Sequence, residues 1–580
     1  MNVENEVETN LTVAAVKQLP NKAGDSVPTK KDLSLIELAT MLTKMPKLAD
    51  VGRSGIETFM REAGCNEEQI AEHLPTLTAT DDGDVGQFGK KEAQSTALVK
   101  MALENGIDLF HSPGGKTYAC VKINSRSETL PVRSMDFRSY LCRLYFEKAE
   151  RVAGGQGVQD ALNVLDAKAK YEGAEERVYC RVAQRDGAVY LDLANTERQI
   201  VAITPNGWYI TTDAPVRFRR PKAMLALPTP VPGGDLTTEL KPFINAEDSE
   251  FILIVAWLLS TLQPSGAYPI LQIKGEQGSA KSTTSKLIRN LIDPNEAPAR
   301  AQPKEERDLV IALSNSLIGC FDNLSYIPEW LSDVFCRVST GQSFSTRTLH
   351  TDEDESIFSV QRPIILNGIE ELSTRGDLVD RSIIVDLPRI PSDKRRTEAE
   401  FKAAFENAQA VLLGALLDVA AAAFANLENV APKDLPRMSD FARWAIAAEP
   451  KLGWPSGTFL TAYKRNNKNA DLVALEASPI AGAILRFMDQ GKREWKGTPS
   501  ALLKELTDLN ERVGLRDVKH PAWPKTPHGL GNAVRRLAPS LRSAGLNVHC
   551  WKSGSRYIHL SHSGGATDGI DTAPGGLSLT

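Results

Sequence analysis

One stretch of the chain, Tyr268–Ser282, constrains the fold more than any other. A short apolar run, Ile270–Ile273, is typical of a buried strand, and it leads into a loop of small residues, Gly275–Ala280. Lys281 and Ser282 then open an amphipathic segment that predicts a helix. A strand, such a loop and a helix form the setting of a phosphate-binding loop, because loop amides and a helix N-terminus attract anions. The sequence therefore predicts a P-loop within an α/β fold.

The spacing of this loop suggests a role for each residue in binding ATP. Lys281 would reach the β- and γ-phosphates, and the Ser282 hydroxyl would ligate Mg²⁺. The pattern departs from G-x-x-x-x-G-K-[ST] at Ala280, and we expect the loop to tolerate this alanine if its φ is negative. An ordinary glycine-rich turn is the alternative. The candidate nucleotide-binding residues are Gly275, Glu276, Gln277, Gly278, Ser279, Ala280, Lys281, Ser282 and Thr283.

Bulk properties exclude several classes of protein. A length of 580 residues suggests about four domains. The net charge of −5 excludes a uniformly basic nucleic-acid binder, so any surface for nucleic acid must be local. The seven cysteines include no C-x-x-C pair, which argues against a zinc module or a disulfide framework and fits a reducing cytosol. The polar, acidic start predicts no signal peptide.

The two most apolar runs, Phe251–Leu262 and Ala410–Leu427, predict buried helices rather than membrane spans. The first is too short to cross a bilayer, and the second carries Asp418 near its middle. We therefore expect a cytoplasmic protein that has no contact with a membrane.

Changes in composition and periodicity predict an α/β multidomain chain whose ATPase core is built on a parallel sheet. The expected divisions are a disordered start at 1–32, a helical arm at 33–85, an α+β domain at 90–232, the P-loop ATPase core with a helical lid at 240–430, a linker at 431–477, a winged-helix module at 478–562 and a disordered tail at 563–580.

The α+β domain offers two weak signals of function. Asp192 lies on a predicted strand, as in primases that hold two metal ions with two aspartates, but the second position is Ala194. One carboxylate cannot hold two metals, so we favour a surface aspartate. A basic cluster precedes a proline-rich linker at 227–233, and it predicts either a solvated face or a contact with a nucleic-acid backbone. Its members are Arg217, Arg219, Arg220 and Lys222.

Within the core, later strands end in residues that a nucleotide-driven enzyme needs. The strand predicted at 316–321 ends in Asp322, which can hold the Mg²⁺ water shell, followed by Asn323. An asparagine can position water but cannot take its proton, so hydrolysis is slow or the base lies elsewhere, for example in Asp352–Glu355. Asn367 ends the next strand and is a candidate sensor of the γ-phosphate. The candidate catalytic residues are Lys281, Asp322, Asn323, Asn367 and Arg381.

Two further features of the core suggest contacts with other molecules. Arg381 precedes the last strand, where it can reach a neighbouring subunit's nucleotide as an arginine finger, or else form a surface salt bridge. A β-hairpin predicted between 343 and 360 bears Arg347 and His350. This hairpin would either touch a DNA backbone in a central channel or remain a solvated hairpin.

The order of these residues resembles that of superfamily 3 helicases, and more closely the primase-helicases of phages, plasmids and integrated elements. It covers about 240–430 and is carried by Gly275, Lys281-Ser282, Asp322-Asn323, Arg347-Thr348-Leu349-His350, Asn367 and Asp380-Arg381. The resemblance implies an AAA+-type ATPase that uses ATP and Mg²⁺ to translocate along DNA and unwind it, as a homo-oligomeric, commonly hexameric ring with other replication proteins as partners. No intact primase site is evident.

The C-terminal stretch predicts a DNA-binding winged helix. Three Ser/Thr–Pro pairs, at 478, 498 and 526, each open a helix, and two strands follow. Residues 491–560 hold thirteen Lys/Arg against five Asp/Glu, which is typical of DNA binding. Mobile-element primase-helicases end in segments similar to Trp495–Thr498 and Trp523–Thr526. Protein contact is the alternative use. The candidate DNA-binding residues here are Lys525, Arg535, Arg536, Lys552 and Arg556.

Three functions stay open at this level. The first is an ATP-dependent DNA helicase or replication ATPase of a mobile element. The second is a nucleotide-switched DNA-binding regulator with little unwinding, which Asn323 keeps open. The third is a defence or signalling ATPase with the region 90–232 as its effector, although no nuclease or protease constellation is visible there.

Overall fold

The computed structural model describes most of the chain after residue 92. The described residues are 93–123, 126–342, 344–347, 355–358, 360–368, 376–431, 434–476, 478–513, 516–520 and 523–562. The chain divides into two compact units, Met1–Glu92 and Ala93–Thr580, and the described residues belong to the second. The predictions for 1–32, 33–85 and 563–580, and for His350, lie outside these ranges.

A four-stranded parallel sheet carries the predicted phosphate loop, so the predicted α/β class with a parallel sheet is confirmed. Its order is β12-β15-β11-β16, and all of its pairings are parallel. The strands are nearly continuous apolar runs, as expected when helices cover both faces of a sheet. They are β11 (Ile270–Lys274), β12 (Gly319–Leu324), β15 (Ile364–Gly368) and β16 (Ser382–Asp386).

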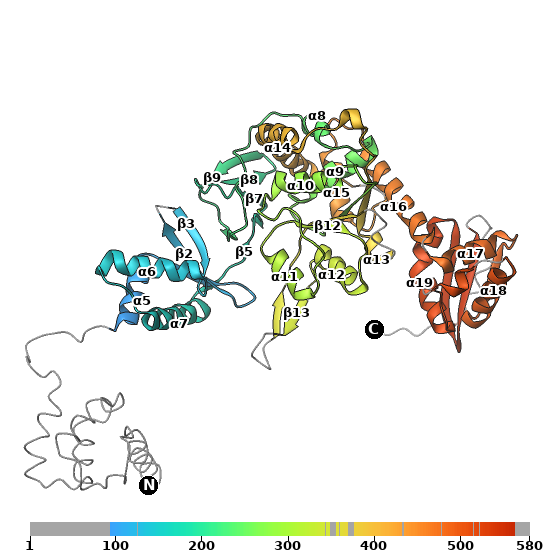
Figure 1. Ribbon diagram of the computed structural model, residues 1–580, viewed down its shortest axis with the longest axis horizontal. Helices are drawn as coiled ribbons and strands as arrows, with labels where there is room; N and C mark the ends of the chain where they lie inside the picture. Colours follow the sequence, from blue (N-terminus) through green and yellow to red (C-terminus); the bar gives the residue numbers. More distant parts are fainter. Residues whose placement is uncertain are drawn as a thin grey trace, which may run out of the picture. The chain divides into compact units, whose positions relative to one another are not determined.

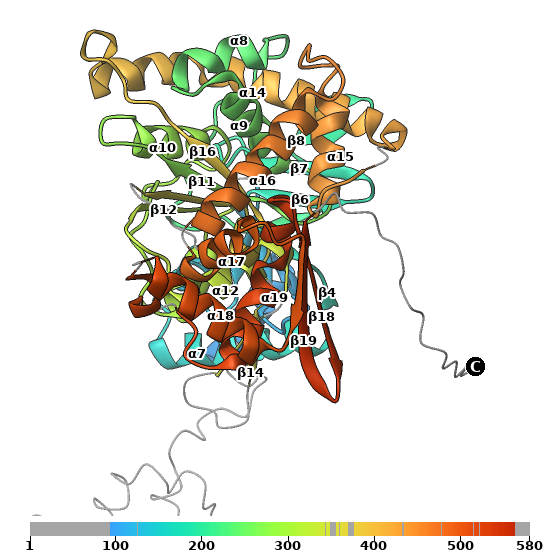
Figure 2. The same ribbon diagram turned by 90° about the vertical axis from the view of Figure 1, so that its right-hand side faces the viewer.

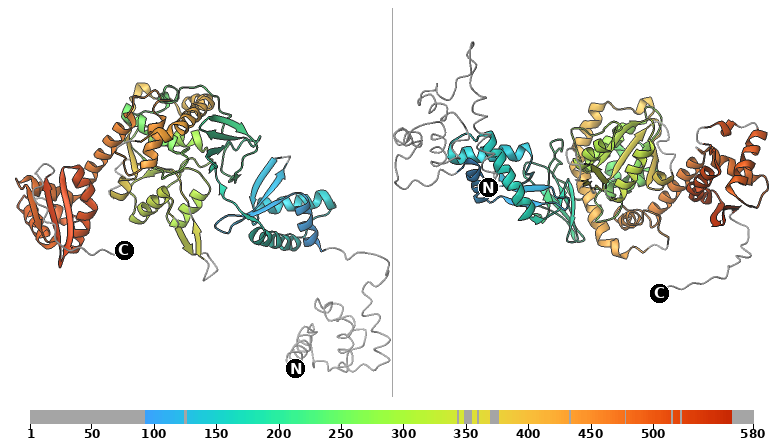
Figure 3. Two further views of the ribbon diagram at one scale, coloured as in Figure 1. Left: turned by 180° about the vertical axis from the view of Figure 1, so that it is seen from behind. Right: turned by 90° about the horizontal axis from the view of Figure 1, so that it is seen from below.

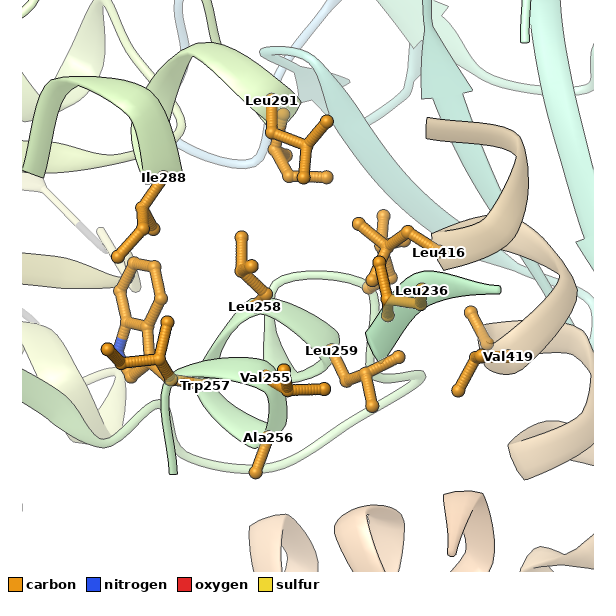
Figure 4. Packing of buried hydrophobic residues seen from close by; sticks show 14 of the residues in the cluster. Leu236, Val255, Ala256, Trp257, Leu258, Leu259, Ile288, Leu291, Leu416 and Val419 are labelled. Atoms are coloured by element: carbon orange, nitrogen blue, oxygen red, sulfur yellow. The ribbon is translucent and has the colours of Figure 1, made fainter. Parts of the chain in front are cut away.

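Helices from distant parts of the chain pack around this sheet (Figure 1). Close packing in the main core brings Trp257 toward Ile288, and Leu416 beside Leu236 (Figure 4). The helices of this region are α8 (Leu236–Leu240), α9 (Asp248–Ser260), α10 (Lys281–Ile292), α11 (Glu306–Ser314), α12 (Glu329–Thr340), α13 (Gly376–Val379) and α14 (Glu398–Asn426).

Both apolar runs form buried helices, as predicted. The first lies in α9, and the second lies in α14. Among the described residues, Glu398–Asn429 is the one helix long and apolar enough to cross a membrane, and 56% of its most apolar window is buried inside the protein. Its Asp418 accepts hydrogen bonds from Trp208 Nε1 at 2.7 Å and from the Gly233 amide at 2.9 Å. These contacts are those of a core helix.

The segment 227–233 is packed against α14 rather than hanging free as the predicted linker. The Val231 amide donates to the Ala410 carbonyl at 2.9 Å. A Cβ at Gly414 would lie 1.8 Å from the Val231 carbonyl oxygen, so only glycine allows this approach.

Residues 431–477, which we expected to be a linker, instead form two helices of the core. These are α15 (Ser439–Ala448) and α16 (Thr458–Glu476). Phe441, Phe459 and Tyr463 are fully or almost fully buried, with ring centroids 5.3–5.7 Å apart; Phe459 stacks on Tyr463, and Phe441 meets both rings edge-on. These helices pack against α9. Trp444 Nε1 of α15 donates to the carbonyl of Leu259 in α9, which lies 185 residues earlier in the chain.

The predicted domain 90–232 consists of two parts with separate cores. The first joins a sheet of order β3-β2-β1-β4 to three helices. Its elements are α5 (Gln94–Glu104), β1 (Asp108–His111), β2 (Thr117–Ile123), β3 (Arg126–Pro131), α6 (Met135–Ala149), α7 (Gly155–Tyr171) and β4 (Ala174–Glu175).

The second part is an antiparallel sheet of order β6-β7-β8-β9 whose apolar residues join the core around the parallel sheet. Most of these strands therefore pack with the neighbouring parallel-sheet region rather than with the first part. The elements are β5 (Val178–Tyr179), β6 (Val182–Arg185), β7 (Ala188–Asp192), β8 (Ile200–Thr204), β9 (Gly207–Thr211) and β10 (Arg217–Phe218), with β5 and β10 paired in parallel.

Asp192 is buried, so the expectation of a surface aspartate is wrong. Its carboxylate accepts a hydrogen bond from Arg220 Nε at 2.8 Å and another from the Ala194 amide at 3.0 Å. Arg217 and Arg219 are also occupied within the protein, by Glu176 at 2.8 Å and by the Asn315 side chain at 2.9 Å. Three members of the basic cluster thus hold this part of the fold together.

Residues 478–562 form a group with its own core, shown in red in both views of Figure 3. Ser478, Thr498 and Thr526 each accept a hydrogen bond from the backbone three residues on, so the three predicted N-caps are confirmed. The elements are α17 (Pro479–Asp489), β17 (Glu494–Gly497), α18 (Pro499–Arg512), α19 (Pro527–Ser543), β18 (Leu546–Ser553) and β19 (Ser555–His562), with sheet order β17-β19-β18.

A buried ion cluster joins the antiparallel sheet to the parallel one. Arg181 and Asp293 are fully buried, with Arg181 Nε 3.3 Å from Asp293 Oδ1. Arg181 also donates to the carbonyls of Asp192, Leu225 and Pro294. These bonds satisfy a cation that burial alone would strongly destabilise.

Replacing Arg181 by Met should therefore lower the free energy of unfolding by about 3–5 kcal/mol, because Asp293 loses one of its two buried cations and the carbonyls lose their donor. Urea unfolding of the purified chain measures this effect. The control is Arg185→Ala, which breaks an exposed pair with Asp186 and should change stability by about 0.5 kcal/mol at most. Equal losses in the two variants would contradict a structural role for the buried cluster.

Candidate functional site

The loop after β11 is held from outside by the chain that follows β16. The Leu387 amide donates to the Lys274 carbonyl at 2.9 Å, and the Ile390 amide donates to the Gly278 carbonyl at 3.2 Å. Gly275 has φ +146°, and a Cβ there would lie 2.5 Å from the Leu387 carbonyl oxygen. Glycine is therefore required at this position for the loop to pass the neighbouring strand.

Ala280 adopts the left-handed conformation, with φ 65° and ψ 28°, so the condition of a negative φ is not met. An L-residue with a Cβ loses about 1–2 kcal/mol in this region of φ/ψ space. The loop nevertheless turns into α10 at Lys281, because packing on both sides over-determines the backbone.

Lys281 lies across the mouth of the loop. Its Nζ donates to the carbonyl oxygens of Gly275 at 2.6 Å and Glu276 at 2.8 Å. The buried Ser279 closes the turn by donating its hydroxyl to the Glu276 carbonyl at 2.9 Å. The ammonium group therefore stands where a polyphosphate held by the loop amides would need a positive charge.

Ser282 and Asp322, the two predicted magnesium ligands, come together. The Ser282 hydroxyl donates to Asp322 Oδ1 at 2.8 Å, which joins the first turn of α10 to β12. A hydroxyl and a carboxylate at this separation fit Mg²⁺, which takes few protein oxygens and completes its shell with waters and phosphates.

A bulge at the end of β12 sets the position of Asp322. The β12–β15 register shifts between Phe321 and Leu324, and Asn323 has φ 57°. Asparagine tolerates the left-handed region better than most residues, which gives a physical reason for its presence here. Cys320, two residues before Asp322, is buried, and burial raises the pKa of its thiol to about 12.

Asn367 lies beneath the site and links three of its elements. Its Oδ1 accepts from the Asn323 amide at 2.9 Å, and its Nδ2 donates to the Ser285 hydroxyl at 3.0 Å. Ser285 in turn donates to the Lys281 carbonyl at 2.9 Å. Asn367 is only 1% exposed, so in this structure it positions the bulge and α10.

Arg381 lies at the amino ends of the parallel strands, opposite the end that carries the loop. It precedes β16, whereas the loop follows the carboxyl end of β11, so the chain does not bring Arg381 to its own loop. Its Nη1 donates to the Asp377 carbonyl at 2.7 Å, and its side chain is 17% exposed. The neighbouring Asp380 pairs with Arg437 at 2.8 Å, and burial raises the pKa of Asp380 while Arg437 opposes the shift.

Arg395 approaches the loop and was not singled out from the sequence. A Cβ on Gly278 would lie 3.2 Å from its Nη2, so the guanidinium borders the loop. The run Lys394-Arg395-Arg396 after the last strand was the available signal. Its meaning depended on the turn that returns this segment to Gly278 before α14 begins.

The DNA-binding candidates that the structure describes fall in two parts of the chain. Arg347 ends β13 (Phe344–Arg347), which pairs with β14 (Glu355–Phe358), so the predicted hairpin is confirmed in its strands. The C-terminal candidates are all exposed, and Arg556 Nη1 lies 3.0 Å from His528 Nδ1. These exposed residues are Lys525, Arg535, Arg536, Lys552 and Arg556.

Comparison with protein families finds two matches. Residues 235–466 match the model of the actinomycete integrative conjugative element replication protein. Residues 480–571 match the model of the C-terminal domain of the same protein, RepA. Together they cover more than half of the chain. They agree with the resemblance to replication proteins of integrated elements.

No curated protein matches the chain. Among solved structures, two of the NrS-1 C-terminal region in its apo A form align with 82% of this chain and 100% of their own. Their identities are 12% and 11%, and their TM-scores of 0.36 and 0.33 are too low to carry an argument.

The strain at Ala280 leads to a stability prediction. Ala280→Gly should raise the free energy of unfolding by about 0.5–1 kcal/mol, because relief of the left-handed strain exceeds the added entropy of the unfolded chain. The matched control is Ala403→Gly at an exposed position of α14, which should lower it by about 1 kcal/mol. Urea unfolding distinguishes the two signs, and a destabilised Ala280→Gly would argue against a strained loop.

Proposed function

Over its two matched ranges the chain is a mobile-element replication protein, and we propose that it works as an ATP-driven motor on DNA. The observation that carries this proposal is the meeting of Lys281, Ser282 and Asp322 around a small-residue loop. We assign residues 240–430 to the P-loop, AAA+-like ATPases of the superfamily 3 helicase type. We assign residues 478–562 to the winged-helix domains.

In this proposal the loop amides of 276–283 bind the phosphates of ATP, aided by the positive end of α10. Lys281 exchanges its carbonyl partners for the β- and γ-phosphate oxygens, and Arg395 brings a second cation to the Gly278 side of the loop. Ser282 and Asp322 would hold Mg²⁺, which neutralises charge on the transferred phosphoryl group.

In this site the residue next to Asp322 cannot act as the base that takes a proton from the attacking water. Asn323 occupies the position beside Asp322, and its backbone is fixed by Asn367. An amide can orient a water molecule but cannot accept its proton, so the expected turnover is slow. Such a site favours a protein whose ATP cycle depends on assembly or on DNA.

Assembly into a ring would complete the site from outside. Arg381, at the amino end of β16, is then available to a neighbouring subunit's ATP, where a cation stabilises the transition state. We therefore expect a homo-oligomer, hexameric by analogy with superfamily 3 helicases, that works with other replication proteins. The alternative, a nucleotide-switched DNA-binding regulator, rests on Asn323.

Lys281→Ala should reduce ATP turnover by about 10²-fold or more, because the loop loses its phosphate cation. It should also abolish DNA-stimulated turnover and strand displacement, which are measured on a forked duplex. The control is Lys402→Ala, an exposed lysine of α14 that pairs with Glu406 and should leave both activities unchanged. Nucleotide-dependent DNA binding by the wild type, with negligible turnover, would favour the regulator instead.

Combined Arg535→Ala and Arg536→Ala changes should weaken DNA binding and reduce its salt dependence. Each lost phosphate contact lowers the slope of log K against log salt by about 1. Fluorescence anisotropy at several salt concentrations measures this slope. Arg143→Ala with Lys168→Ala removes two cations that pair with their own helix neighbours, and it serves as the control. An unchanged slope in the C-terminal variant would show that α19 binds something other than DNA.

A further inference from the structure

One face of the C-terminal sheet is open to solvent. Strand side chains alternate between faces, and Val548, Ile558 and Leu560 point into the local core. The opposite face of the sheet is formed by the long hairpin of β18 and β19 (Figure 2) and by β17, which pairs with β19. Its residues on β18 include His549 and Trp551, whose partners on β19 are His559 and Tyr557.

The open face carries a continuous stack of rings. The rings of His549 and Trp551 have centroids 5.5 Å apart and planes 26° apart. The rings of Trp551 and Tyr557 are also 5.5 Å apart, with planes at 18°. Three nearly parallel rings offer a flat nucleobase a surface on which to continue the stack.

Positive charge lies beside these rings. Lys496 Nζ, from β17, lies 5.2 Å from the centre of the Trp551 ring. Arg493 is exposed just before β17, whereas Lys552 and Arg556, also exposed, alternate onto the other face of the hairpin with Val548 and Ile558. The one acidic residue on β17, Glu494, pairs with His559 at 3.4 Å. The surface thus combines stacking rings with cations that attract phosphates.

We propose that this aromatic face, defined by Lys496, His549, Trp551 and Tyr557, binds single-stranded DNA. Base faces are hidden in a duplex and become available only when a strand is released, so stacking rings select the single strand. The surface is separate from α19, which packs on α16 through hydrogen bonds from Ser540 and Ser543 to Asp471. The inference rests on the proposed function only in taking DNA as the partner.

Stacked pairs across strands also stabilise a hairpin, so the test must separate binding from folding. The double variant Trp551→Ala with Tyr557→Ala, in the full chain without nucleotide, should bind a labelled oligo-dT about 10-fold or more weakly. Its affinity for a blunt duplex should change by about 2-fold at most. Trp551→Phe keeps a flat ring and should retain most of the single-strand affinity. Tyr209→Ala, at an exposed tyrosine elsewhere, is the control.

Circular dichroism establishes that each variant is folded. If the double variant is unfolded, His549→Ala with Lys496→Ala tests the same face at two exposed positions and should also weaken oligo-dT binding. A folded variant that binds oligo-dT like the wild type, or loses duplex and single-strand affinity equally, overturns the proposal. Lys281→Ala should bind oligo-dT normally, so failure of the ATPase and failure of this surface give different results.

Discussion

The buried carboxylate of Asp293 is the interaction on which the rest of the structure depends. It sits at the C-terminal end of α10, pairs with Arg181 at 3.3 Å and accepts the Leu317 amide, just before β12, at 2.9 Å. The helix that follows the predicted phosphate loop and the strand that carries Asp322 are thus tied at their far ends. Their near ends meet through Ser282 and Asp322. A buried ion of this kind is stable only because every partner is present.

The candidate site uses backbone conformations that cost free energy. Ala280 and Asn323 are both left-handed, and each directs a neighbouring side chain, Lys281 or Asp322, to the loop. Such strain persists where surrounding bonds over-determine the backbone, here those made by the Asn367 side-chain amide and by the segment after β16. The same bonds that orient the phosphate loop leave a neutral amide where a base would stand, which explains why assembly matters to the proposed activity.

The C-terminal group concentrates the positive charge that the whole chain lacks. Its two basic surfaces differ in chemistry, since α19 offers Arg535 and Arg536 while the sheet adds rings around Trp551. Phosphate contact by the first is indifferent to strandedness, and stacking on the second requires separated strands. A protein that opens DNA would use both, with the helix α16 joining this group to the parallel-sheet region through Asp471.

Features governed by close neighbours along the chain were predictable from the residues alone. The strand, loop and helix around Lys281 and the cap at Thr498 depend on a few adjacent positions, so periodicity and capping chemistry were sufficient. The conformation of Ala280, the burial of Asp192 and the packing of 431–477 depended on partners up to hundreds of residues away. A local pattern shows that a side chain is polar or a segment amphipathic. Only the tertiary fold supplies the partner that makes its burial favourable.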